Sequence, residues 1–295
     1  MACVRWDLMF PIVSGVVGQV VVDTSYTLSE LSYNAVANAG TQTVTELMVS
    51  PSQMIISTEP GSTEKLLAYA FDDSSLPNFG SLEDQLAVSN ENPRGTTFGD
   101  SGDYLYISGN ASPYLQRREL STAYDISTAG TTTTTNTASF GWGGQGLAFK
   151  SDGSILFAAE GNNIRVCNLN TNWDITSING TPSTVALSGQ NDDDGDSIST
   201  LLGVRFKPDG TKFFVCYRVD NTPKVAEFSL STAWDLSTKS FVSSLNIGDK
   251  LGYYSSGVLG YPAGLDWNSD GSRLYLSSIH VELTIGQIQV AEYVA

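Results

Sequence analysis

A nine-residue pattern that recurs along the chain restricts the fold more than any other feature. It reads LSTAWDLST at residues 230–238, LSTAYDIST at 120–128 and LNTNWDITS at 169–177. A short strand-like run precedes each copy, and further upstream a tight turn leads into a second strand-like run. A repeat of this length that is built only from strands is typical of a β-propeller, in which each repeat forms one blade.

The tight turns predict the number of repeats. Four of them end in Gly102, Gly153, Gly210 and Gly271, which lie 51, 57 and 61 residues apart, and a degenerate copy at residues 50–53 precedes another strand-like run. Asp favours such turns and Gly accepts the positive φ at their exit, so each turn joins two antiparallel strands. Five turns predict five four-stranded antiparallel blades.

The fourth repeat shows the expected strands, at 203–206, 212–217, 224–230 and 237–244, and the third repeat places its outer strand near Ile175. Glycine at the start of each innermost strand, as at Gly203, lets the backbones approach around a central channel.

Both ends of the chain carry parts of the repeat. Residues 23–29 can be laid over 231–237, and residues 290–295 over 225–230. We therefore expect an all-β, five-bladed β-propeller over residues 23–295, with the ring closed by an N-terminal strand that joins the C-terminal blade. Such closure removes free sheet edges, which otherwise promote aggregation.

An aromatic residue and an aspartate stand at the centre of the repeated pattern. We expect the aromatic residues to pack between blades and the aspartates Asp125, Asp174 and Asp235 to cap a turn. A structural role is favoured because a feature that recurs once per repeat is unlike a single active site. The aromatic residues are Tyr26, Tyr124, Trp173 and Trp234.

Composition excludes some classes of partner. Lys and Arg total 15 against 31 Asp and Glu, which gives a formal net charge of −16. An acidic surface disfavours nucleic acid and anionic membranes, because both are bound through Lys and Arg. No apolar run reaches the roughly 20 residues that span a bilayer, and no signal peptide is evident, so we expect no membrane insertion and synthesis in the cytoplasm. Three cysteines without a CxxC spacing indicate free, buried thiols at Cys167 and Cys216.

Residues 1–22 match no repeat and are rich in apolar side chains, among them Trp6, Leu8, Met9 and Phe10. One interpretation is a strap that covers one end of the domain. The other is an anchor that attaches the protein to a partner, because an apolar segment of this size is uncommon on a solitary monomer. The sequence leaves both open.

Any binding site is expected on the face opposite the regular turns. The tight turns and the LSTAWD-like motifs fall on one face of the ring, whereas the irregular loops and two long connections, 188–200 and 249–262, fall on the other. Binding residues usually lie in such loops. The candidates are Tyr253, Tyr254, Tyr261 and His280.

An acidic run, NDDDGD at residues 191–196, is the candidate metal site. Asp192, Asp194 and Asp196 at alternate positions could converge on calcium, although the run departs from the EF-hand pattern, and no other cofactor is expected. A solvated acidic loop is the alternative.

The sequence offers few candidates for a catalytic site. His280 is the only histidine, no phosphate-binding GxxxxGK[ST] is found, and Asp266 is the one suspected carboxylate.

The LSTAWDxST motif together with the FxPDG turn at residues 206–210 resembles a repeat of β-propeller proteins from marine bacteria and their tailed phages. The resemblance implies a propeller and a virion component, and it brings no catalytic residues. The first hypothesis is therefore a structural virion protein, either a capsid decoration or a tail-associated module, that binds other virion proteins. A host-surface glycan is a further candidate partner of such a virion protein. The second hypothesis is a carbohydrate-binding, lectin-like propeller with one shallow site per blade, and the third is a polysaccharide hydrolase or lyase.

Overall fold

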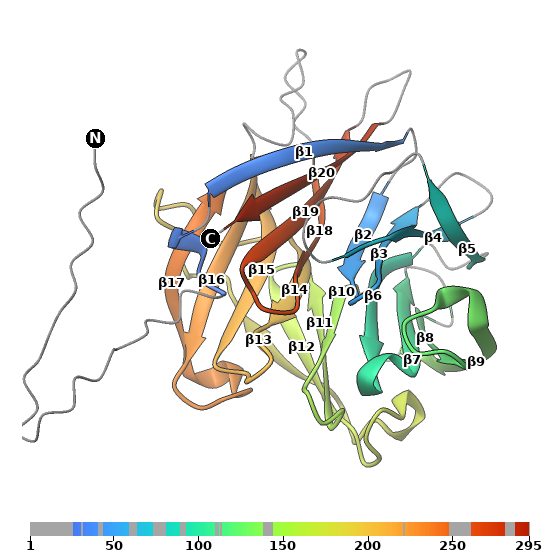
Figure 1. The fold of residues 1–295 in the computed structure, drawn as a ribbon. Helices are drawn as coiled ribbons and strands as arrows, with labels where there is room; N and C mark the ends of the chain where they lie inside the picture. Colours follow the sequence, from blue (N-terminus) through green and yellow to red (C-terminus); the bar gives the residue numbers. More distant parts are fainter. Residues whose placement is uncertain are drawn as a thin grey trace, which may run out of the picture.

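The repeats fold into antiparallel strands that are joined by short turns (Figure 1). The structure is a computed structural model, and it describes residues 26–30, 32–40, 44–58, 64–72, 81–88, 93–109, 112, 114–137, 144–220, 222–247, 261–280 and 287–294. Within these residues the strands form five sheets of four strands each, and every neighbouring pair of strands is antiparallel.

Four of the sheets follow the chain in order. The first contains β2 (Val44–Val49), β3 (Gln53–Thr58), β4 (Lys65–Ala70) and β5 (Leu82–Ala87). The second contains β6 (Pro93–Gly99), β7 (Tyr104–Gly109), β8 (Tyr114–Leu120) and β9 (Ala129–Asn136). The third contains β10 (Gln145–Phe149), β11 (Ile155–Glu160), β12 (Asn163–Asn168) and β13 (Ser183–Ala186). The fourth contains β14 (Leu201–Phe206), β15 (Lys212–Val219), β16 (Thr222–Leu230) and β17 (Lys239–Asn246).

The remaining sheet combines both ends of the chain. It contains β18 (Tyr261–Trp267), β19 (Arg273–His280) and β20 (Gln287–Val294), and its outer strand is β1 (Ser32–Gly40). Strand β1 runs antiparallel beside β20 (Figure 1), and in this pairing Ser32 lies opposite Val294. The first strand of each sheet contacts the first strand of the next, from β2 through β6, β10 and β14 to β18, and β18 contacts β2. The predicted all-β propeller of four-stranded antiparallel sheets is confirmed.

Short 3-10 helices precede the outer strands, and they correct two predicted boundaries. They are η1 (Leu28–Glu30), η3 (Ile126–Thr128), η5 (Ile175–Ser177) and η6 (Leu236–Thr238), and η2 (Asp100–Gly102) forms a turn of the second sheet. The outer strand of the fourth sheet begins at Lys239 rather than at Ser237. The strand expected near Ile175 is wrong: the Asp174 carboxylate accepts the N–H of Thr176 and caps a helical turn there, and the strand follows at Ser183–Ala186.

The repeated aromatic residue packs onto the glycine of the tight turn in its own sheet. The N–H of Trp234 donates to the carbonyl of Gly210 at 2.9 Å, and Tyr26, Tyr124 and Trp173 make the same bond to their glycines. A Cβ on Gly210 would lie only 2.2 Å from the Trp234 ring. The ring also contacts the neighbouring sheet, where Phe157 lies 6.3 Å from Trp234 between ring centroids. The motif is therefore a joint within and between sheets.

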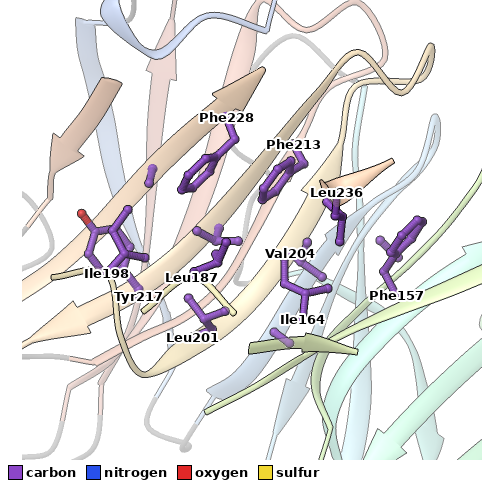
Figure 2. Packing of buried hydrophobic residues seen from close by; sticks show 14 of the residues in the cluster. Phe157, Ile164, Leu187, Ile198, Leu201, Val204, Phe213, Tyr217, Phe228 and Leu236 are labelled. Atoms are coloured by element: carbon purple, nitrogen blue, oxygen red, sulfur yellow. The ribbon is translucent and has the colours of Figure 1, made fainter. Parts of the chain in front are cut away.

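Apolar side chains fill the spaces between neighbouring sheets. Figure 2 shows one such cluster between the third and fourth sheets, in which Phe213 and Phe228 stack at 4.7 Å with nearly parallel rings. Phe157 and Ile164 of the third sheet belong to the same cluster. Cys167 and Cys216 are buried free thiols in the described part of the chain, as the sequence predicts, and both are held in such apolar surroundings.

Candidate functional site

The five innermost strands run in the same register, so equivalent residues face one another around the axis. Each of these strands has an aromatic or apolar residue at or near its end, and the residue directly before it lies at the same level of the channel in all five strands. At that level the sequence places the neutral residues Met48, Thr97 and Ala148, together with the charged residues Arg205 of β14 and Asp266 of β18. The centre of the ring is therefore occupied by an arginine and a carboxylate.

Arg205 contacts all five sheets. Its side chain is 8% exposed, and its Nε lies 3.2 Å from Oδ1 of Asp266. Its two terminal nitrogens donate at 2.8 to 3.2 Å to one backbone carbonyl of its own strand β14 and to one carbonyl each of β2, β6 and β10. These carbonyls belong to Leu47, Thr96, Leu147 and Val204. A guanidinium has five N–H groups, and the five oxygens match them. Arg205 is thus a structural group that keeps no donor for a ligand.

Asp266, the suspected catalytic carboxylate, is held by three donors. Its Oδ1 also accepts the N–H of Trp267 at 2.9 Å, and its Oδ2 accepts the N–H of Val49 on β2 at 2.9 Å. These bonds join the last sheet to the first. Asp266 therefore acts in the structure as a bridge between sheets.

Glu46 is a second carboxyl group at the centre, and sequence reasoning missed it. Its side chain is fully buried, its Oε1 accepts the N–H of Leu47 at 3.0 Å, and Arg205 Nη2 lies 3.7 Å away. Its Oε2 has no hydrogen-bond partner among the described residues. Burial raises the pKa of Glu46 to about 8, against the opposing effect of Arg205. Glu46 is consequently protonated and uncharged at neutral pH, and the positive charge of Arg205 is balanced by Asp266 alone.

Glu46 occupies space that the other innermost strands leave to glycine. A Cβ on Gly264 would lie 2.2 Å from Oε1 of Glu46, and a Cβ on Gly146 would lie 2.5 Å from the backbone of Gly203. The predicted close approach of glycine backbones around the channel is therefore present. When the innermost strands are aligned in sequence, Glu46 stands at the position of Gly203 and Gly264. This alignment is the signal that could have shown Glu46 to lie at the centre of the ring.

A hollow lies over the channel on the face of the tight turns. It consists of two pockets of about 280 and 390 Å³, both lined by Thr97, Phe98, Tyr124 and Arg205. Asp266 and Trp267 line the first, and the aromatic residues Phe149, Trp173, Phe206 and Trp234 line the second. This hollow is on the face opposite the one for which the sequence predicts binding.

Two of the four predicted binding residues lie outside the described part of the chain. Tyr253 and Tyr254 fall outside the described residues, Tyr261 begins β18 and His280 ends β19. The apolar residues Trp6, Leu8, Met9 and Phe10 also fall outside. The expectation of a site on the second face therefore stays a prediction. None of the helices in the described part of the chain is long and apolar enough to cross a membrane.

The three aspartates of the acidic run do converge, and a lysine stands at their centre. Asp192, Asp194 and Asp196 each offer an oxygen within 4.8 Å of the others. The ammonium of Lys224, which is 2% exposed on β16, lies 2.7, 2.8 and 2.8 Å from these carboxylates. Tyr217 donates its hydroxyl to Asp192 at 2.8 Å. In this structure the positive charge among the three carboxylates is the ammonium group of Lys224. Calcium binding stays a prediction.

Comparison with known proteins gives similarity at the level of structure only. No protein-family model and no curated protein matches the sequence. Among solved structures, a chain of a nidogen/laminin complex is 14% identical, with a TM-score of 0.47 over 77% of this chain and 73% of that chain. The PQQ domain of pyranose dehydrogenase from Coprinopsis cinerea is 12% identical, with a TM-score of 0.45 over 89% and 97%. A functionally unknown protein from Desulfotomaculum acetoxidans is 11% identical, with a TM-score of 0.42 over 82% of this chain and 66% of that chain.

Proposed function

We propose that the protein is a five-bladed β-propeller, closed by β1, that serves as a structural component of a tailed-phage particle. It acts by binding other virion proteins, either as a capsid decoration or as a tail-associated module. The repeated motif supports this proposal, since LSTAWDxST with FxPDG resembles repeats of propeller proteins from marine bacteria and their phages. The pairing of β1 with β20 supports a ring that is closed by its own ends.

The single observation that best supports a non-enzymatic role is that Arg205 is fully hydrogen-bonded within the protein. In the described part of the chain, both carboxyl groups at the centre of the ring lie against this arginine, and its N–H groups are matched by oxygens of the protein. A hydrolase that uses paired carboxylates needs one group to give a proton and another to act as base or nucleophile. Asp266 is held by three donors, so it is unsuited to that task, and a scaffold role fits the geometry better.

In this proposal residues 1–22 are the attachment segment and 23–295 form the domain. The protein is made in the host cytoplasm and resides in the virion. An acidic, rigid ring suits a surface component, because net charge keeps exposed protein soluble.

Quantitative mass spectrometry of purified particles tests the proposal. We expect the protein at a fixed copy number relative to the major capsid protein, retained after density-gradient purification. Protein that stays in the cell lysate and is absent from purified particles would refute the virion role. A variant that lacks residues 1–22 is expected to fold and to be lost from particles. Retention of that variant would instead favour the strap interpretation.

A further inference from the structure

The hollow on the face of the tight turns has no part in the proposed function. Its two pockets share four lining residues, so they form one depression over the channel. Small-molecule sites are typically concave, largely apolar and several hundred Å³ in volume. Arg205 and Asp266 form part of its floor, and because Arg205 joins all five sheets the floor is rigid. A rigid floor lowers the entropic cost of holding a ligand.

Planar aromatic groups surround this depression. Phe98, Phe149 and Phe206 each lie at or next to the end of an innermost strand, and each is half-buried. Trp173 and Trp234 of the repeated motif complete the wall of the larger pocket, and both are also half-buried. Each side chain therefore keeps some surface exposed. An aromatic surface suits a ligand that presents a flat patch of C–H groups, as the face of a pyranose ring does.

The rim provides neutral hydroxyl groups. Ser101 and Ser151 are exposed on neighbouring tight turns and line the larger pocket. A hydroxyl both donates and accepts a hydrogen bond, so it suits the hydroxyls of a sugar. The aromatic wall thus suits the C–H face of a hexose, and the serine rim suits its hydroxyl groups.

The charges favour a neutral sugar over an acidic one. Among the residues that line the hollow, the two cations are Arg205 and Lys150, and each lies against a carboxylate. Lys150 Nζ is 2.7 Å from Oδ2 of Asp152. Neither cation is left to neutralise a uronic acid, a sialic acid or a phosphate, and the chain carries a formal net charge of −16.

We propose that the hollow over the channel binds a neutral hexose unit of a glycan. This site is independent of the attachment segment and of the location of the protein in a particle. The ligand lies across Phe98 and Phe149, with its hydroxyls toward Ser101 and Ser151.

The test combines a glycan array with saturation-transfer NMR on the full chain and on two matched variants. Ser151→Trp places a bulky side chain at the rim of the hollow without changing the core. Ser231→Trp makes the same change at an exposed serine of the repeated motif that does not line the hollow. Ser101→Trp serves as a second blocking variant if Ser151→Trp lowers the melting temperature.

We expect the wild-type chain to bind neutral glycans in preference to sialylated or uronic ones. The blocking variant should lose at least tenfold in affinity, and Ser231→Trp should bind like the wild type. Absence of glycan binding in both assays, binding of acidic glycans alone, or full binding by the folded blocking variants would each overturn the proposal. None of these results bears on whether the protein is found in particles, so the two proposals fail separately.

Discussion

Replacing Glu46 by Gln is expected to stabilise the protein, and the gain should grow with pH. Gln has nearly the same shape and stays neutral, whereas Glu46 must remain protonated to be buried without cost. The pKa of Glu46 is raised from 4.5 to about 8 in the folded protein because burial disfavours the charge. Between these two values the folded state holds a proton that the unfolded state has lost.

The sign and size of the effect follow from this difference. Stability from Glu46 is fully present below pH 4.5 and is lost as the pH rises to about 8. At about 1.4 kcal/mol for each pH unit, the complete loss is on the order of 5 kcal/mol. The Gln variant avoids this loss. Its advantage over the wild type should thus be small near pH 5 and should reach several kcal/mol near pH 8.

Urea denaturation at pH 5, 6.5 and 8 measures the difference between the two proteins. Other groups titrate in both, so the difference in unfolding free energy isolates residue 46. Glu83→Gln, at an exposed position on β5, is the matched control and should change little at any pH. If the difference between wild type and Glu46→Gln were the same at pH 5 and pH 8, Glu46 would not titrate in this range. A wild type that is more stable than the variant at pH 8 would show that Glu46 is ionised and paired with Arg205.

Two further predictions concern the acidic run and the repeated joint. Lys224→Met leaves three close carboxylates without their cation and should cost about 3–5 kcal/mol, and millimolar calcium should restore part of the lost melting temperature. In scanning fluorimetry the wild type should not respond to calcium or EDTA; stabilisation of the wild type by calcium would mean that metal binds beside Lys224. Gly210→Ala should destabilise by roughly 2–4 kcal/mol, because its Cβ would strike Trp234 at a positive φ of 73°. Gly161→Ala has a φ of 57° and open space around it, so it should lose only about 1 kcal/mol in urea denaturation; equal losses for the two variants would argue against the joint.

The repeat made the fold predictable because it marks local turns. A glycine at the exit of a turn and an aspartate at a helical cap are imposed by backbone geometry within a few residues, so Gly210 and Asp235 can be located from sequence alone. The outer strand of the third sheet is placed too early by the sequence because Ile175 and Thr176 are β-branched and favour a strand locally, while Asp174 turns the chain into a 3-10 helix.

The centre of the ring was less predictable because its partners come from different repeats. Asp266 bonds to Arg205 and to Val49, which lie far away in sequence, and the register of the innermost strands is what brings them together. Lys224 likewise approaches the acidic run from β16, and no motif within that run announces it. Charge pairing across repeats requires the three-dimensional arrangement.

Arg205 is above all a structural group that joins all five sheets. The non-enzymatic role and the preference for a neutral ligand both follow from it. Hydrogen exchange of Arg205→Met, followed by mass spectrometry, tests this directly, with Arg205→Lys as the milder variant. Arg165→Met is the control, because Arg165 pairs with Glu160 and Thr184 inside the third sheet. We predict faster exchange in β2, β6, β10, β14 and β18 together for the Arg205 variants, and changes confined to the third sheet for the control. Faster exchange in β14 alone would show that Arg205 does not join the five sheets.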